Sequence, residues 1–131
     1  MLMNKIERFE DIVAWQKARV LTKQIYATAK IGAFARDYGL KDQIQRSSVS
    51  TMANIAEGFE RGGDKEFLQF LSDSKGSCGE VKSHLYVAVD QNYITPITFD
   101  DLYGKANEVS RLVGGFMTYL RDSTLRGNKY R

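Results

Sequence analysis

The stretch "DKEFLQFLSDSKGSCGEVKSHLYVAVD", from Asp64 to Asp90, shows the clearest helical period in the chain. Its apolar and small residues recur at steps of four and three, at Phe67, Leu71, Ser74, Cys78, Val81, Leu85 and Ala88. Such steps return to one side of an α-helix, whereas a strand alternates at every second residue. The stretch therefore predicts an amphipathic helix, expected over about residues 64–92.

Three other segments repeat this spacing and predict helices over about residues 11–31, 38–61 and 98–122. Residues at the borders support these limits. Asp11 and Asp64 are placed to act as N-caps, and Gly62 with Gly63 is placed to end the second helix. Pro96 is expected to end the third helix, before a capping box in which Thr98 is paired with Asp101.

Four helices of about twenty residues with short connections predict an all-α fold, an antiparallel up-down-up-down four-helix bundle. The 131 residues include one Pro and no linker-like block, so residues 1–131 are expected to form a single domain. A flexible basic tail is expected from about residue 123.

Composition narrows the classes of function. Lys and Arg outnumber Asp and Glu by 19 to 16, which favours anionic partners only mildly. A lone cysteine, Cys78, excludes an intramolecular disulfide, and no apolar run is long enough for a membrane span or a signal peptide. A cytoplasmic protein without membrane association is the expectation.

No pattern of catalytic or ligand-binding residues is complete in this sequence. His84 is the only histidine, Cys78 falls in the apolar stripe, and "GFERGG" lacks the strand and the Lys-Ser/Thr of a phosphate loop. We expect no metal, no cofactor and no enzymatic activity. A site built across subunits, with Glu57 and His84 as its first candidates, is the remaining enzymatic alternative.

Two features allow more than one interpretation. The first is a line of polar residues on one face of the second helix, at Ser47, Ser50, Asn54, Glu57 and Arg61, which is either a solvated face or a set of specific contacts. The second is a set of glycines inside the last two helices, at Gly76, Gly79, Gly114 and Gly115. These glycines either allow close helix contacts or are merely tolerated.

The polar line begins in "YGLKDQIQRSSVS" and continues in "ANIAEGFERGGDKEFLQFL"; together these stretches resemble the four-helix-bundle family called 23S rRNA intervening-sequence proteins. "FEDIVAWQKARVLTKQIY", from Phe9 to Tyr26, resembles the opening helix of that family, and "EVSRLVGGFMTYLR" resembles its last helix. The most specific part is Asn54-Ile55-Ala56-Glu57-Gly58 with the downstream Lys65-Glu66-Phe67.

The resemblance implies a bacterial, cytoplasmic bundle that assembles as a ring-like homo-oligomer, with a pentamer as the expected state. It implies no established reaction. The family is similar to accessory proteins of diversity-generating retroelements, which bind nucleic acid and a reverse transcriptase, so RNA or DNA binding is suggested by association. For Asn54, Glu57, Gly58 and Arg61 it implies a structural or subunit-interface role.

The leading hypothesis is therefore a non-catalytic, oligomeric accessory module that binds nucleic acid. The candidate phosphate contacts are basic residues spread along the chain, namely Lys17, Arg19, Arg36, Lys41, Arg46, Arg121, Arg126 and Lys129. The alternative is a protein–protein interaction scaffold that does not bind nucleic acid.

Overall fold

The computed structural model describes residues 6–126, and side chains of that range through Ser123. Within this range the elements are all helical, and four of them are long: α1 (Val13–Ala29), α3 (Tyr38–Arg61), α4 (Asp64–Asp90) and α5 (Pro96–Arg126). A 3-10 turn, η1 (Phe9–Asp11), precedes them, and the short helix α2 (Gly32–Arg36) links α1 to α3. The prediction of an all-α fold is confirmed.

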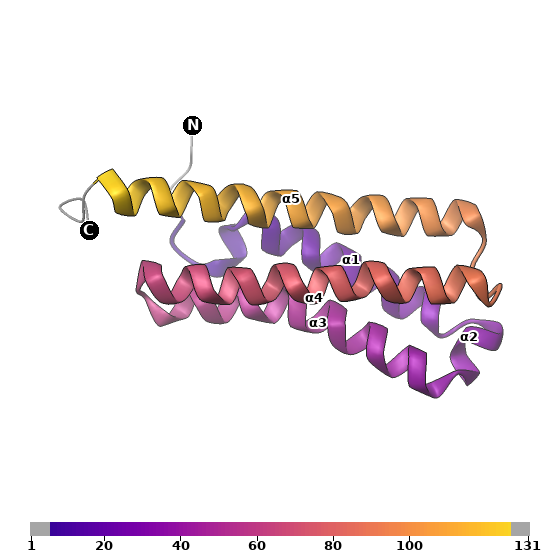
Figure 1. Cartoon of the computed structure of the whole chain (residues 1–131). Coiled ribbons are helices and arrows are strands. Elements are labelled where there is room, and N and C mark those ends of the chain that lie inside the picture. The colour runs from indigo at the N-terminus through magenta and orange to yellow at the C-terminus, as the bar shows by residue number, and fades with distance from the viewer. Residues whose placement is uncertain (1–5, 127–131) are drawn as a thin grey trace.

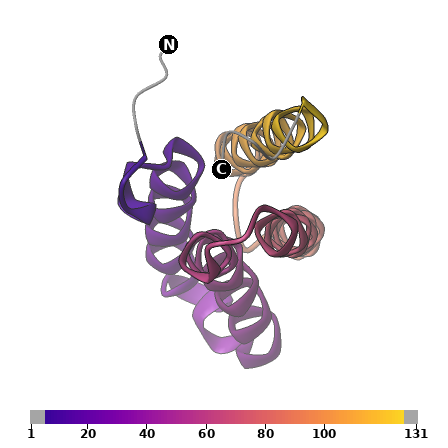
Figure 2. The same ribbon diagram turned by 90° about the vertical axis from the view of Figure 1, so that its left-hand side faces the viewer.

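The four long helices alternate in direction, as Figure 1 shows, and form an antiparallel bundle. Each packs against two others: α1 contacts α3 and α5, and α4 contacts the same two helices from the other side. Viewed from one end, α3 leans away from the bundle axis toward α2 (Figure 2). This order places α4 and α5 side by side along most of their length.

The core is built from the stripes that the spacing predicts. In α4 the seven residues of the stripe are the seven buried ones. In α5 the same spacing runs through Leu102, Ala106, Val109, Val113, Phe116 and Leu120. These residues are buried except Phe116, which is only partly buried, and Met117 is buried beside it. Burial of each large side chain contributes roughly 1.5–3 kcal/mol to stability.

The predicted border between α4 and α5 is wrong, and the structure shows why. α4 ends at Asp90, six residues before Pro96. Just after this end Asn92 adopts a left-handed conformation with φ of 62°, and the Tyr93 amide donates to the Ala88 carbonyl. Pro96 instead begins α5, where its missing N–H costs nothing. The cap is Thr95, whose Oγ1 accepts from the Thr98 amide at 3.1 Å.

The predicted N-caps Asp11 and Asp64 do not cap α1 and α4. Asp11 belongs to η1, and its carboxylate accepts from the amides of Glu7 and Arg8, so it does not cap α1. Gly63 is the N-cap of α4, and Asp64 is the first residue of that helix. The end of α3 follows the prediction, because Gly62 adopts a left-handed φ of 87°.

The segment between the first two predicted helices, residues 32–37, contains α2. Phe34 of this helix is buried and stacks on Tyr93 with ring centroids 5.5 Å apart. Asp37 caps α3 through the Leu40 amide and also accepts a hydrogen bond from the Tyr93 hydroxyl at 2.9 Å. Asp37 thus ties the α2–α3 corner to the α4–α5 connection. At the other end of the chain, α5 continues to Arg126, past the predicted helix end near residue 122.

α3 lies close against α4 at Gly58. A Cβ atom there would lie 2.7 Å from the Phe70 Cβ and 2.8 Å from the Phe67 Cδ1. No real side chain fits at these distances without a shift of one helix. Gly76 differs, because it is exposed and a Cβ on it would meet open space.

We therefore expect Gly58→Ala to lower the free energy of unfolding by about 1 kcal/mol or more, because overpacking costs about 1–3 kcal/mol and exceeds the gain in helix propensity. Gly76→Ala, the matched control, should raise it by up to about 1 kcal/mol. Urea unfolding followed by circular dichroism measures both. Equal or higher stability of Gly58→Ala would contradict the close contact.

Candidate functional site

The first part of the polar line on α3 faces α4. Ser47 is 5% exposed, and its hydroxyl donates to Glu80 at 3.3 Å. The hydroxyls of Ser50 and Ser77 are 2.9 Å apart and share a hydrogen bond. The interpretation of this part as a solvated face is therefore wrong. α3 packs against both α1 and α4, so it buries a second side that the apolar stripe does not mark.

The second part of the line lies at the α3–α4 connection. Asn54 donates to the carbonyl and to the hydroxyl of Ser50, at 2.9 and 3.0 Å. Arg61 forms the ion pair with Glu57 that their spacing predicts, at 2.8 Å, and reaches Glu66 of α4 at 3.5 Å. Of these contacts, the Arg61–Glu66 pair crosses the turn, and the others lie within α3. Arg61 and Glu57 remain about half exposed, so solvent screens their attraction.

The predicted phosphate contacts do not converge within one chain. Lys17 is engaged by Glu108 at 3.6 Å, Arg46 by Asp42 at 2.8 Å, and Arg19 lies over the Trp15 ring. The others are spread over the molecule, with Arg36 in α2, Lys41 at the start of α3 and Arg121 near the end of α5. The Arg126 side chain and Lys129 lie outside the described part of the structure.

A different set of cations does converge, in a groove between α4 and α5. This basic groove has a volume of about 560 Å³ and is lined by Lys75, Lys82, Asn107, Ser110, Arg111, Gly114, Gly115 and Thr118. No Asp or Glu of the described residues, 6–126, lines the basic groove. Lys82 donates to the Asn107 side chain at 3.1 Å, across the two helices.

Lys75 and Arg111, on opposite walls of the basic groove, are exposed. Neither forms an ion pair with an acidic residue in the described range. No sequence pattern predicts this pair, because positions 75 and 111 come together only through the antiparallel packing of α4 against α5. The available signal was the seven-residue spacing of Lys75 and Lys82, which places both on one helix face.

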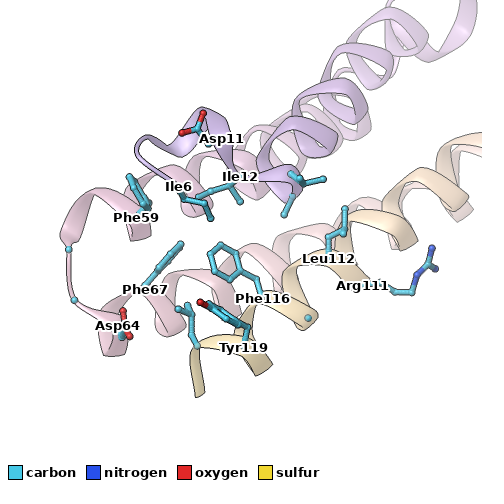
Figure 3. Close-up of a pocket in the computed structure, with 16 residues that line it drawn as sticks. Ile6, Asp11, Ile12, Phe59, Asp64, Phe67, Arg111, Leu112, Phe116 and Tyr119 are labelled. Carbon is cyan, nitrogen blue, oxygen red and sulfur yellow. The ribbon is translucent and has the colours of Figure 1, made fainter. Parts of the chain in front are cut away.

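A second groove, apolar and larger, opens between α1 and α5 near the α3–α4 connection. Its volume is about 1200 Å³. Ile12, Phe67 and Phe116 point into it, and Arg111 lies at its edge and points away (Figure 3). Phe116 packs edge-on against Phe67, with ring centroids 5.2 Å apart. Phe116 lines this open groove, which explains its partial exposure.

The groups considered for catalysis are dispersed. Cys78 is fully buried, donates to the Ala106 carbonyl at 3.2 Å, and has its thiol pKa raised by burial. Partial burial lowers the pKa of His84. Glu57 lies near the α3–α4 connection, whereas His84 lies toward the far end of α4. Within residues 6–126, no three His, Cys, Asp or Glu side chains are grouped as metal ligands.

Alternating helices with short connections define the class of this protein, a four-helix bundle with two grooves flanking α5. The chain belongs to the 23S rRNA-intervening sequence protein family, whose model matches residues 10–115. No curated protein matches it. None of the helices in the described range is both long and apolar enough to cross a membrane.

A solved structure with the same fold comes from Bacteroides thetaiotaomicron and is described as a protein of unknown function from the S23 ribosomal protein family. It matches with a TM-score of 0.75 and 20% sequence identity, covering 81% of this chain and 96% of its own. At this identity the likeness supports the fold alone.

We expect a double-mutant cycle of Ser50→Ala and Ser77→Ala to give a coupling free energy of about 0.5–1.5 kcal/mol, because the two hydroxyls bond each other across the α3–α4 seam. The cycle cancels the effect of each substitution on helix propensity. Urea unfolding of the four proteins measures the coupling. The control cycle pairs Ser50 with the exposed Ser83 and should show no coupling free energy. A coupling free energy of zero between Ser50 and Ser77 would contradict the hydrogen bond across the seam.

Proposed function

We propose that this protein is a non-catalytic, homo-oligomeric accessory module that binds RNA or DNA in the bacterial cytoplasm. The observation that carries the proposal is the basic groove, in which Lys75, Lys82 and Arg111 converge without a carboxylate. Three cations at one place, two of them without an ion pair in the described range, favour a polyanionic ligand.

Assembly would make a modest groove effective. The net charge is only +3, so one chain presents a weak electrostatic target. Copies of the basic groove around a ring would act on one strand together, since each contact after the first is intramolecular and benefits from a high effective concentration. The proposed assembly is a pentamer, the state that resemblance to the family implies.

We expect the affinity for a fluorescein-labelled RNA or DNA oligonucleotide to fall steeply as salt is added. Lys75→Gln/Arg111→Gln should weaken binding and flatten the slope of log K against log salt concentration by about 1.4–1.8 for each bound chain. Fluorescence anisotropy over a salt series measures both effects.

A matched control removes the same charge elsewhere. Lys23 and Lys30 are exposed at α1 and its end, away from the basic groove. Lys23→Gln/Lys30→Gln should retain most of the affinity and the slope. Failure of the natural protein to bind any oligonucleotide at low salt would refute the proposal, and equal effects of the two double variants would refute the assignment to the groove.

For the assembly, we expect light scattering at micromolar concentration to return about five times the 14.9 kDa mass of one chain. Dilution and added salt serve as controls for weak or purely electrostatic association. A mass of one chain under all these conditions would contradict the oligomer.

The second candidate function is a protein–protein interaction scaffold, and the apolar groove between α1 and α5 favours it. Apolar surface that stays open to solvent is a common feature of partner contacts. The two functions differ in what the native protein retains after nuclease treatment. Recovery of one defined protein favours the scaffold, whereas loss of every partner favours nucleic acid.

A further inference from the structure

Three aromatic side chains form a cluster at one end of the basic groove. Tyr86 of α4 lies against Phe99 and Tyr103 of α5, with ring centroids 4.9 and 5.6 Å away, and Phe99 stacks on Tyr103 at 5.2 Å. Phe99 and Tyr103 also pack against the core. Tyr86 differs from them, because half of its surface is exposed.

The aromatic cluster and the basic groove form one continuous surface. Lys82 joins them, since its ammonium lies 5.9 Å from the centre of the Tyr103 ring and also bonds Asn107 in the groove. Along α4, Lys75, Lys82 and Tyr86 follow each other at steps of seven and four, which keeps them on one face. From Lys75 to Tyr86 this surface extends about 16 Å along the helix.

Neighbouring groups orient the exposed ring. The rings of Phe99 and Tyr103 both contact the Tyr86 ring, at interplanar angles of 56° and 75°, and the neighbouring Tyr103 hydroxyl raises the pKa of Tyr86. An aromatic ring that is both exposed and held in place loses little conformational freedom when a planar group stacks on it.

We infer that the α4–α5 surface binds a single strand of nucleic acid, with phosphates at Lys75, Lys82 and Arg111 and a base stacked on Tyr86. This inference rests on the proposed function and specifies its ligand. Cationic grooves flanked by aromatic rings bind single strands, because unpaired bases expose their faces. In a duplex the faces are stacked inside the helix and cannot reach Tyr86.

The test compares one fluorescein-labelled 20-nucleotide strand, as RNA and as DNA, with the corresponding duplex at the same salt concentration. The protein should bind the single strand at least tenfold more tightly. Tyr86→Leu retains apolar bulk against Phe99 but removes the aromatic face. It should weaken single-strand binding by about five- to a hundredfold.

Two further variants separate stacking from structure. Tyr86→Phe retains the ring and should retain the affinity. Tyr38→Ala removes a tyrosine that is 75% exposed on α3, away from the groove, and should change nothing. Because Tyr86 makes no phosphate contact in this scheme, Tyr86→Leu should leave the salt dependence unchanged, unlike Lys75→Gln/Arg111→Gln.

Each outcome decides the inference. Duplex binding as tight as single-strand binding, or full affinity of Tyr86→Leu, overturns it while the proposed nucleic-acid function stands. If the protein binds neither the single strand nor the duplex, both this inference and the proposed nucleic-acid function are overturned. Tighter binding of the single strand together with loss in Tyr86→Leu and retention in Tyr86→Phe supports it.

Discussion

Small polar side chains at the seam between α3 and α4 govern the packing of the bundle. The Ser74 hydroxyl donates to the Thr51 carbonyl at 2.6 Å within the buried seam, and the bonds from Ser47 and between Ser50 and Ser77 extend it. These residues are short, so the helices approach until Gly58 lies against the rings of α4. Sliding one helix by a turn would separate the buried Ser74 hydroxyl from the Thr51 carbonyl, and breaking such a bond is costly in a medium of low polarity. The seam therefore fixes the register of the pair.

That register determines where the grooves lie. One side of α4 packs against α3, and Lys75 and Lys82 lie on another side of α4, which borders α5. On the far side of α5, the separation from α1 leaves Phe116 lining an open apolar groove (Figure 3). Arg111 and Gly115 border both grooves, so α5 is their common wall.

The parts of this fold that the sequence predicts are those set by local spacing. The stripe from Phe67 to Ala88 matches the buried side of α4, and Gly62 ends α3 as its conformational freedom suggests. The N-cap of α5 could not be predicted in this way, because Thr95 and Thr98 are both favoured N-cap residues. Only the folded chain shows that Thr95 caps the helix. The basic groove could not be predicted from the sequence, because Lys75 and Arg111 line it together only when α4 pairs with α5, and no local pattern encodes that pairing.

The two walls of the basic groove belong to different helices, and this division has a thermodynamic consequence. An anion that contacts both walls binds the native arrangement of α4 and α5 and has no comparable site on the separated helices. Binding energy is then linked to folding, and a ligand at a hundred times its Kd adds about 2.7 kcal/mol to the stability of the site. Occupancy of the groove would thus protect the backbone amides of both helices from hydrogen exchange, as a clamp across the hairpin would.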